Sequence, residues 1–443
     1  MYESLYASLF ENHQYGTQTT IGTIEHLKSP SLVAIQKYFD TYYVPNNMVI
    51  SLSGDFDPDE AIRIINEKFG SWMPKDFPSF KVAQEKLIKV PVVKEVVGPD
   101  AESLMMGFRF RGANSPDADL LTIVDYILSN GQAGLLDINL NTKQKVLSAG
   151  SSTDIMKDYS VHMFSGRPRE GQSLEQVRDL ILEQIMELKL GNFPDWMIPA
   201  VVNNLRLEQE KSYENNFNRA SAMLNSALDG VPYKNVVNRM DRLSKINKEQ
   251  VIQFVRDWYG ENYVIVYKRN GVDENRVKVE KPAITPVEMN RELQSEFLKK
   301  IISNKVNPIS PVFIDYSTSI STSKLKNSIP IYSVVNSENN LFSLNYTFEM
   351  GSSSDKRWPL IMQYVDYLGT ATLSASKLQE EFYKLGCSFS ATCGEDQITI
   401  QLEGISNNFI PAILLLEDLL AGPIADEEAL KNLVNDILKK REC

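Results

Sequence analysis

Histidine is the scarcest of the residue types that could do chemistry in this sequence of 443 residues. The three histidines are His13, His26 and His162, and no two of them lie four residues apart or near one another in the chain. Protein zinc sites combine histidine, cysteine or carboxylate ligands, often two of them at helical spacing. The sequence therefore predicts no histidine-pair metal motif and no metal ligand in this chain.

Each histidine also has a plain structural interpretation. His13 lies close to Glu11, but one histidine and one carboxylate do not make a closed metal site. We therefore expect His13 at the surface or at a helix cap. His26, beside Glu25, is expected where a helix begins, and His162 lies in an alternating segment that is typical of a β-sheet.

The other candidate groups lack partners that would make them reactive. Ser374 and Ser376 have no histidine nearby in the sequence, so nucleophilic catalysis is not predicted. The pairs Glu380–Glu381 and Glu427–Glu428 are expected on solvated helix faces. The loop Asn130–Gly134 follows a helix and lacks the Lys-Ser/Thr ending of a phosphate loop. We therefore predict no catalytic, cofactor-binding or metal-binding residue.

Composition and charge exclude several classes of function. The formal net charge is 46 − 57 = −11, with 43% hydrophobic and 23% charged residues, which are globular proportions. The acidic balance argues against a nucleic-acid partner. No apolar run approaches the ~20 residues that a membrane-spanning helix needs. Cys387, Cys393 and Cys443 are odd in number, which disfavours a disulfide framework; the first two are expected on one strand, although a pair across a turn stays open.

The apolar pattern indicates an α+β fold of repeated modules, in which mixed or antiparallel sheets pack against helices. We predict four segments. Residues 1–85 form the C-terminal part of a first α+β domain, and residues 86–270 form a second α+β module. Residues 271–312 lose periodicity and are predicted to be a linker. Residues 313–443 are expected to be the start of a third, truncated α+β module.

The first segment reads as helix, strand, helix. A helix is expected to open at Ser29-Pro30-Ser31, with proline in its first turn. Residues 47–53 alternate like a half-buried strand, and residues 57–70 follow as a second helix. Ile62 and Phe69 of that helix are expected to face inward.

The later segments carry further start and stop signals. Strands are expected near Val146–Ile155 and Tyr159–Gly166, followed by a helix with a capping box at Ser173–Gln176. A long helical stretch is expected over 194–228. In the third module a capping box is predicted at Ser376–Gln379.

A short internal similarity supports repeated modules. A strand and a glycine precede a helix containing Val124-Asp-Tyr126, and the same order precedes Val365-Asp-Tyr367. Both helices are followed by glycine, at Gly131 and Gly369. These matches are short, but they favour one repeated architecture over unrelated domains.

An ordered set of short motifs covers nearly the whole chain and resembles one peptidase family. The motifs are His13–Gly16, Tyr43–Met48, Ser53–Asp55, Ile127–Gly131, Gly134–Leu136, Gly171–Glu175, Gly369–Thr370 and Phe382–Gly386. The chain is similar to the pitrilysin/insulinase family of zinc metallopeptidases, which includes bacterial zinc proteases and mitochondrial processing peptidases. The resemblance implies a pitrilysin-like fold of α+β modules.

The chemistry of that family depends on an inverted zinc motif, His-x-x-Glu-His, on a helix. Two histidines and a more distant glutamate hold zinc, and the glutamate of the motif acts as general base. The sequence contains no such motif. In the third module, where a second copy would lie, the corresponding residues are Leu360, Gln363 and Tyr364. These residue types cannot supply the imidazole and carboxylate groups that the site needs.

The resemblance therefore implies a segment of a zinc-dependent metalloendopeptidase. Such an enzyme hydrolyses peptides or unfolded polypeptides in an enclosed chamber, and this chain would supply chamber and substrate-contact surface. Zinc would belong to the parent protein, with its ligands outside this chain, and the chain alone is expected to be inactive. Peptides would be held in extended form along a strand edge.

Two further interpretations stay open. The protein could be a non-catalytic peptide-binding or scaffold homologue of these peptidases, or an unrelated α+β binding module. Expected partners are a peptide or unfolded polypeptide and either the missing N- and C-terminal parts or a second subunit. The N-terminus shows no targeting segment. The protein is therefore cytoplasmic or its targeting segment is missing, and a preceding signal peptide would indicate a bacterial periplasmic or cell-envelope location.

Overall fold

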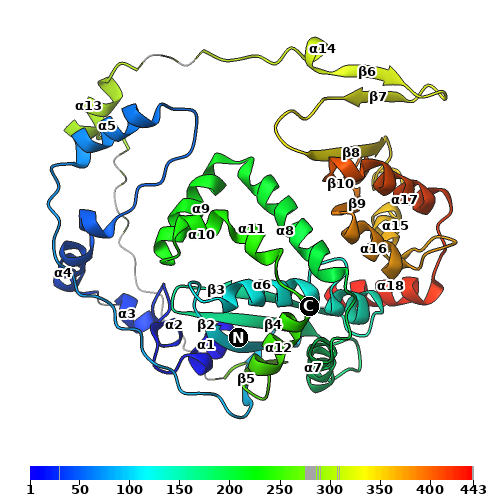
Figure 1. Cartoon of the computed structure of the whole chain (residues 1–443), viewed down its shortest axis with the longest axis horizontal. Helices are drawn as coiled ribbons and strands as arrows, with labels where there is room; N and C mark the ends of the chain where they lie inside the picture. Colours follow the sequence, from blue (N-terminus) through cyan, green and yellow to red (C-terminus); the bar gives the residue numbers. More distant parts are fainter. Residues whose placement is uncertain are drawn as a thin grey trace. The chain divides into compact units, whose positions relative to one another are not determined.

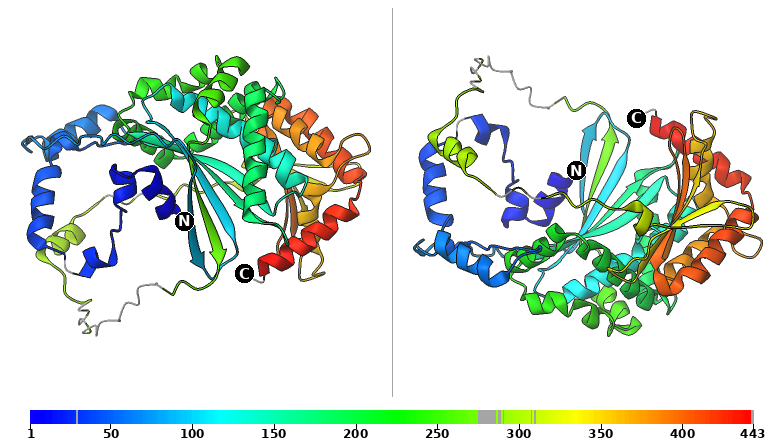
Figure 2. Two further views of the ribbon diagram at one scale, coloured as in Figure 1. Left: turned by 90° about the horizontal axis from the view of Figure 1, so that it is seen from below. Right: turned by 90° about the horizontal axis from the view of Figure 1, so that it is seen from above.

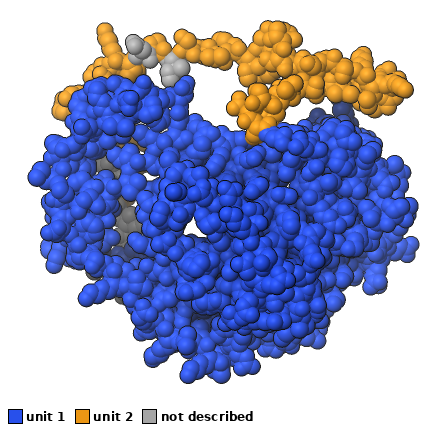
Figure 3. Space-filling model, in the orientation of Figure 1, with its two compact units in different colours: residues 1–272, 340–443 blue, residues 273–339 orange. Residues whose placement is uncertain are grey.

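The computed structural model describes residues 1–28, 30–274, 286, 289, 291–306, 308 and 310–441 (Figure 1). The predicted helix start at Ser29, part of the predicted linker and Cys443 lie outside these residues. The chain forms two compact units, Met1–Val272 with Asn340–Cys443, and Asp273–Asn339 (Figure 3). None of the helices in the described ranges has the length and apolar character to cross a membrane. The predicted four-segment division stays a prediction.

The N-terminal region consists of short helices. They are α1 (Tyr2–Leu9), α2 (Gln14–Thr17), α3 (Ile24–Lys28), α4 (Leu32–Tyr42) and α5 (Pro58–Phe69). The side chain of Ser31 caps α4 by accepting a hydrogen bond from the amide of Ala34 at 3.2 Å. Asp57 caps α5 in the same way through the amide of Glu60 at 2.9 Å. In both helices the capping side chain comes from the residue directly before the first turn.

Two predictions for this region are wrong. The predicted strand over 47–53 is not formed, because none of the described strands lies beside it and a strand needs a hydrogen-bonded partner. Ile62 and Phe69 do not face inward, since their exposed fractions are 63% and 42%. Both corrections have the same physical reason, which is that no second layer of structure covers these residues.

A five-stranded mixed sheet is the centre of the larger unit (Figure 1). Its strands are β1 (Val92–Gly98), β2 (Ser103–Arg111), β3 (Ser148–Ile155), β4 (Tyr159–Arg167) and β5 (Tyr263–Asn270). Their order is β1-β5-β2-β4-β3, with β1 parallel to β5 and the other neighbours antiparallel. The predicted α+β class with mixed and antiparallel sheets is confirmed. Strand β3 is an edge strand, paired with β4 alone among the described strands.

Helices cover one face of this sheet (Figure 2). The helices of this region are α6 (Asp117–Leu128), α7 (Leu174–Leu190), α8 (Met197–Tyr213), α9 (Asn216–Leu228), α10 (Tyr233–Val237), α11 (Arg239–Leu243) and α12 (Lys248–Trp258). The predicted capping box between Ser173 and Gln176 is present at the start of α7. The helical stretch expected over 194–228 is divided into α8 and α9, because Asn215 caps the second helix.

Helix α1 lies on the opposite face of the sheet. Its buried Leu5 and Leu9 pack with Val161, Val264 and Val266 of the strands. The close approach depends on Gly107, because a Cβ at this position would lie 3.1 Å from Leu9 and 3.3 Å from Leu5. The sheet is therefore covered on both faces, but none of the described strands pairs with its β3 edge.

A three-stranded antiparallel sheet forms the rest of this unit. Its strands are β8 (Leu341–Phe348), β9 (Cys387–Cys393) and β10 (Ile398–Ile405), in the order β8-β10-β9. The accompanying helices are α15 (Trp358–Tyr364), α16 (Ala375–Lys384), α17 (Phe409–Ala421) and α18 (Glu427–Arg441). Cys387 and Cys393 are free thiols at the two ends of β9, as predicted. Helix α16 is capped by Ser374, so the predicted cap at Ser376 is wrong.

The elements in the described part of the smaller unit are short. They are α13 (Glu296–Ser303), α14 (Tyr316–Ser319) and a hairpin of β6 (Ser321–Lys324) and β7 (Pro330–Ser333). Its apolar residues are largely exposed, for example Phe297 and Ile302 in α13.

Candidate functional site

The strongest candidate site is the free edge of β3. The side chain of Asn141 occupies the start of this edge: its amide donates to the carbonyl of Ala149, and its carbonyl accepts from the Ala149 amide, both at 2.8 Å. Asn141 thus marks the side on which the backbone of Ala149 is directed away from β4. Because backbone groups alternate along a strand, Ser151, Thr153 and Ile155 direct their N–H and C=O groups to the same side.

The backbone groups on this edge have no partner among the residues that the structure describes. Among the hydrogen bonds of the described residues, none joins the amides or carbonyls of Ser151, Thr153 and Ile155 to a residue outside the ladder with β4. A row of unpaired N–H and C=O groups is a template on which another extended chain can pair. The edge can therefore accept a peptide as an added strand.

A groove of about 570 Å³ adjoins this edge. Thr153 and Ile155 contribute the strand side of the groove, and the other walls come from α6, α8, α10 and α11. The residues that line these walls are Thr122, Tyr126, Leu205, Glu208, Gln209, Ser212, Tyr213, Val236, Arg239 and Met240. A peptide added as a strand to β3 could thus place every second side chain in this groove while its backbone bonds to the edge.

Two charged side chains line the groove and differ in how they are paired. Arg239 lies 3.3 Å from a carboxylate oxygen of Asp119 and donates to the hydroxyl of Thr122 at 2.6 Å. Glu208 accepts a hydrogen bond from the hydroxyl of Tyr126 at 2.6 Å. Burial, followed by this carboxylate, raises the pKa of Tyr126, so the hydroxyl stays a donor. No ion pair joins Glu208 to a cation among the residues that the structure describes.

A buried polar network supports the groove from behind. His162 of β4 lies 2.5 Å from the hydroxyl of Tyr259 and 3.1 Å from the carboxylate of Asp125 in α6. Ser151 of the edge strand also donates to Asp125, at 2.5 Å. The prediction that His162 is a sheet histidine is confirmed. His162 joins β4 to α6, and Asp125 joins α6 to β3 through Ser151. The sequence did not reveal these contacts because the partners are distant in the chain.

The other two histidines do not join this site. His13 caps α2 by accepting from the amide of Tyr15 at 3.2 Å, as predicted, but it is fully buried and lies 3.3 Å from Asp158. His26 lies in α3 and is exposed. The three histidines therefore have separate structural surroundings.

The residues at which a second copy of the zinc motif would be expected lie on α15, and their side chains do not fit zinc. Leu360 is apolar and Gln363 is an exposed amide. The hydroxyl of Tyr364 donates to the carbonyl of Asp426 and accepts from its amide, both at 2.6 Å. Zinc needs imidazole, thiolate or carboxylate donors. Within the described ranges, no group of three or more His, Cys, Asp and Glu side chains could hold a metal ion.

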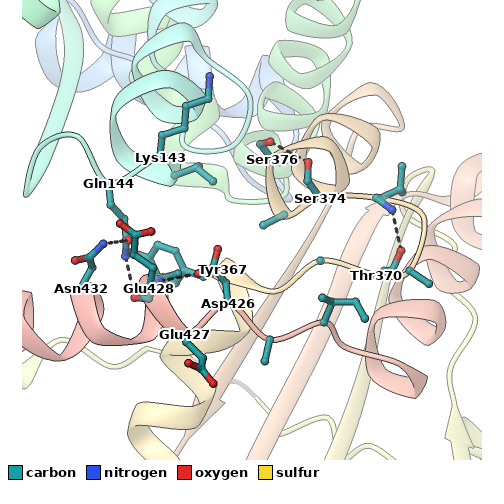
Figure 4. Close-up of a pocket in the computed structure, with 18 of the residues that line it drawn as sticks. Lys143, Gln144, Tyr367, Thr370, Ser374, Ser376, Asp426, Glu427, Glu428 and Asn432 are labelled. Carbon is teal, nitrogen blue, oxygen red and sulfur yellow. Dashed lines mark hydrogen bonds between the residues drawn. The ribbon is translucent and has the colours of Figure 1, made fainter.

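A larger cleft of about 810 Å³ lies near α15, between residues 142–144, 367–376 and 424–432 (Figure 4). Its polar side chains bind one another. Ser374 and Ser376 are 3.2 Å apart, and Gln144 accepts from the amide of Asn432 at 2.8 Å. Glu427 and Glu428 are exposed here, as predicted. Because these groups pair among themselves and do not converge on one point, the cleft is the weaker candidate.

The loop 130–134 and Glu380 have surroundings that the sequence did not reveal. The loop 130–134 directs the amides of Asn130, Gly131 and Gly134 at the buried carboxylate of Asp137, at 2.8, 2.8 and 3.2 Å. The chain thus fills this loop with its own anion. Glu380 is buried and lies 2.7 Å from Lys377, so its predicted solvated position is wrong.

Comparison with known proteins adds an independent finding. Residues 31–205 match the family described as the peptidase M16 inactive domain. Zinc protease PqqE of Helicobacter pylori is 23% identical over 234 residues, which are 50% of this chain and 50% of that protein. The chain thus spans about half the length of this curated relative.

Two solved structures share the fold. A protease from Helicobacter pylori has a TM-score of 0.55 and 17% identity, over 60% of this chain and 66% of that one. The peptidase M16 inactive domain from Pseudomonas fluorescens has a TM-score of 0.52 and 16% identity, over 62% of this chain and 66% of that one.

Proposed function

Because the chain is a pitrilysin-like member of the M16 peptidase family and its sequence lacks the family's catalytic motif, we propose that it is a peptide-binding segment of a zinc metalloendopeptidase. It would hold peptides or unfolded polypeptides and form part of the chamber wall. The zinc, its ligands and the general base would come from another part of the parent protein or from a second subunit. The predicted periplasmic or cell-envelope location stays a prediction.

The observation that carries this proposal is the free edge of β3 beside its groove. The edge offers backbone hydrogen bonds, which do not depend on peptide sequence, over the stretch Ser151–Ile155. Asn141 limits the edge at Ala149, so the added strand would be short. A site of this kind suits a protein that binds many unfolded segments.

The β3 edge can be tested with a proline substitution. Thr153→Pro removes one N–H on the free side and leaves the ladder to β4 intact, which an edge strand tolerates. Thr153→Val is the matched control, since it retains the amide. Binding of a fluorescein-labelled peptide of alternating valine and lysine, measured by anisotropy, should weaken at least about tenfold in the proline variant alone.

A second measurement leaves the protein unchanged. Two versions of the same peptide are N-methylated at every second residue, one at the odd-numbered positions and the other at the even-numbered positions. Only one set faces β3 in an added strand, so only that set should abolish binding. Equal binding of both methylated peptides, or equal binding to the Thr153→Pro and Thr153→Val variants, would remove β3 as the peptide site.

A separate experiment tests whether peptide binding and zinc-dependent hydrolysis lie on different parts of the parent protein. The purified chain should not hydrolyse peptides, whereas a mixture with a polypeptide that carries a His-x-x-Glu-His domain of the parent protein should. A chelator should abolish this activity and zinc should restore it. If the complete, folded parent protein binds peptides without cleaving them, the alternative of a non-catalytic binding or scaffold homologue is the better account.

A further inference from the structure

The β3 groove has features that would select among peptides, and their interpretation rests on the proposed addition of a strand to β3. Side chains of Ser151, Thr153 and Ile155 lie on the face of the sheet that α6 covers, since Ser151 bonds to Asp125 there and the other two line the groove. Asp154 faces the other way and accepts from Tyr2 of α1 at 3.0 Å. A peptide residue opposite Thr153 would therefore direct its side chain into the groove.

The charge in the groove is negative at one defined place. Tyr126 donates a hydrogen bond to one carboxylate oxygen of Glu208, Oε2, and no described residue bonds to the other oxygen, Oε1. Two cations on these helices have other carboxylate partners: Arg239 shares Asp119 with Arg242, at 3.3 and 2.8 Å, and Lys211 lies 2.5 Å from Glu403. The Glu208 carboxylate is thus oriented by a hydroxyl, and no cation of the described residues forms a direct ion pair with it.

The rest of the groove is suited to an apolar neighbour. Ile155 of the strand lines it together with Val236 and Met240. Since side chains on one face of a strand recur every second residue, the peptide residue opposite Ile155 lies two positions from the one opposite Thr153. A cationic residue and an apolar residue at this spacing would meet complementary surfaces.

We propose that Glu208 makes the β3 groove selective for peptides that place a lysine or arginine side chain opposite Thr153, with an apolar residue two positions along. Tyr126 is a positioning residue, because its hydroxyl holds the carboxylate in place. The ligand class is therefore a basic, extended peptide segment.

The test uses three labelled peptides of one sequence that differ at a central residue: lysine, its uncharged isostere norleucine, or glutamate. The unmodified chain should bind the lysine peptide about five- to tenfold more tightly than the norleucine peptide, and the glutamate peptide more weakly still. This preference should decrease as salt increases, because the pair is only partly buried.

Two substitutions on α8 separate a local effect from general charge. Glu208→Gln should abolish the preference for lysine over norleucine. Glu210→Gln removes the same charge from an exposed residue that does not line the groove, and should leave the preference intact. Tyr126→Phe should reduce the preference without removing it, because the carboxylate keeps its charge but loses its fixed orientation.

The outcomes distinguish this proposal from the proposed function. If Thr153→Pro weakens binding but lysine and norleucine peptides bind equally, β3 is a peptide site and the role of Glu208 is wrong. If Glu208→Gln and Glu210→Gln reduce the preference equally, net charge and not the groove is responsible, and the proposal is again wrong. If no peptide binding depends on β3, both proposals fall.

Discussion

Two regions of the larger unit have similar local signals but opposite burial. In the five-stranded sheet region, Phe108, Phe110 and Phe164 are at most 2% exposed. In α4, Leu32 and Phe39 are 79% and 52% exposed. Both regions contain capped amphipathic helices, so the difference does not lie in helix formation. It lies in whether a second layer of structure covers the apolar face.

This difference shows what an amphipathic pattern can and cannot establish. Helix α4 has a side-chain cap at Ser31 and helical spacing of its apolar residues, which are the local signals of a helix. Burial requires a partner surface that the helix itself does not encode. The exposed face of α4 is therefore consistent with the proposal that this region meets another part of the parent protein.

The largest expected effect comes from replacing a phenylalanine by alanine, once in each region. Phe108→Ala should destabilise the chain by about 3–5 kcal/mol, because it leaves a cavity in a packed core. Phe39→Ala, in α4, should change the free energy of unfolding by less than about 0.5 kcal/mol. Urea unfolding followed by circular dichroism measures both. Equal effects would show that α4 is covered in solution.

The next effect concerns two histidines, His162 in the five-stranded sheet and His26 in α3 of the N-terminal region. His162→Phe removes the partner of Asp125 and Tyr259 and should cost about 1–3 kcal/mol. His26→Phe should have little effect, because His26 is exposed and its ring accepts only from the amide of Thr23 among the contacts that the structure describes. Thermal unfolding of the two variants provides the comparison. A neutral His162→Phe would mean that the buried network does not stabilise the sheet.

A smaller effect, of opposite sign, is expected at Tyr383. This residue of α16 is buried in the core of the sheet region, and its hydroxyl has no hydrogen-bond partner in the described part of the chain. Tyr383→Phe should leave stability unchanged or raise it by up to about 1 kcal/mol, since an unsatisfied buried hydroxyl is removed. Tyr259→Phe, which breaks a bond to His162, should instead destabilise. Destabilisation by Tyr383→Phe would reveal an unseen partner, such as a buried water molecule.

The smallest effect on stability is expected from the exposed face of α4. Changing Leu32 and Ile35 to glutamine should leave unfolding within about 0.5 kcal/mol, because both side chains are already in water. The same change should lower the fluorescence of a dye that binds exposed apolar surface. Lys37→Gln on this helix is the control and should leave dye binding unchanged. Unaltered dye binding in the double variant would place the apolar surface elsewhere.

Much of the fold followed from local signals in the sequence. A strand was expected near Val146–Ile155, where β3 forms, and the capping box at Ser173–Gln176 placed the start of α7 correctly. The predicted strand over 47–53 failed, although its residues alternate clearly, because pairing depends on a neighbour. The candidate site was not predicted: Tyr126, Glu208 and Thr153 lie on three elements, and no spacing in the sequence connects them.

The sequence by itself determined that this chain is an α+β protein with the motifs of a zinc peptidase family and without its zinc-binding motif. These properties depend on residue types and on contacts between near neighbours. Only the tertiary structure decided that the edge of β3 is free, that Asn141 limits it and that Glu208 lies beside it. Such facts depend on which distant segments pack together, and packing is a property of the whole chain rather than of any local pattern.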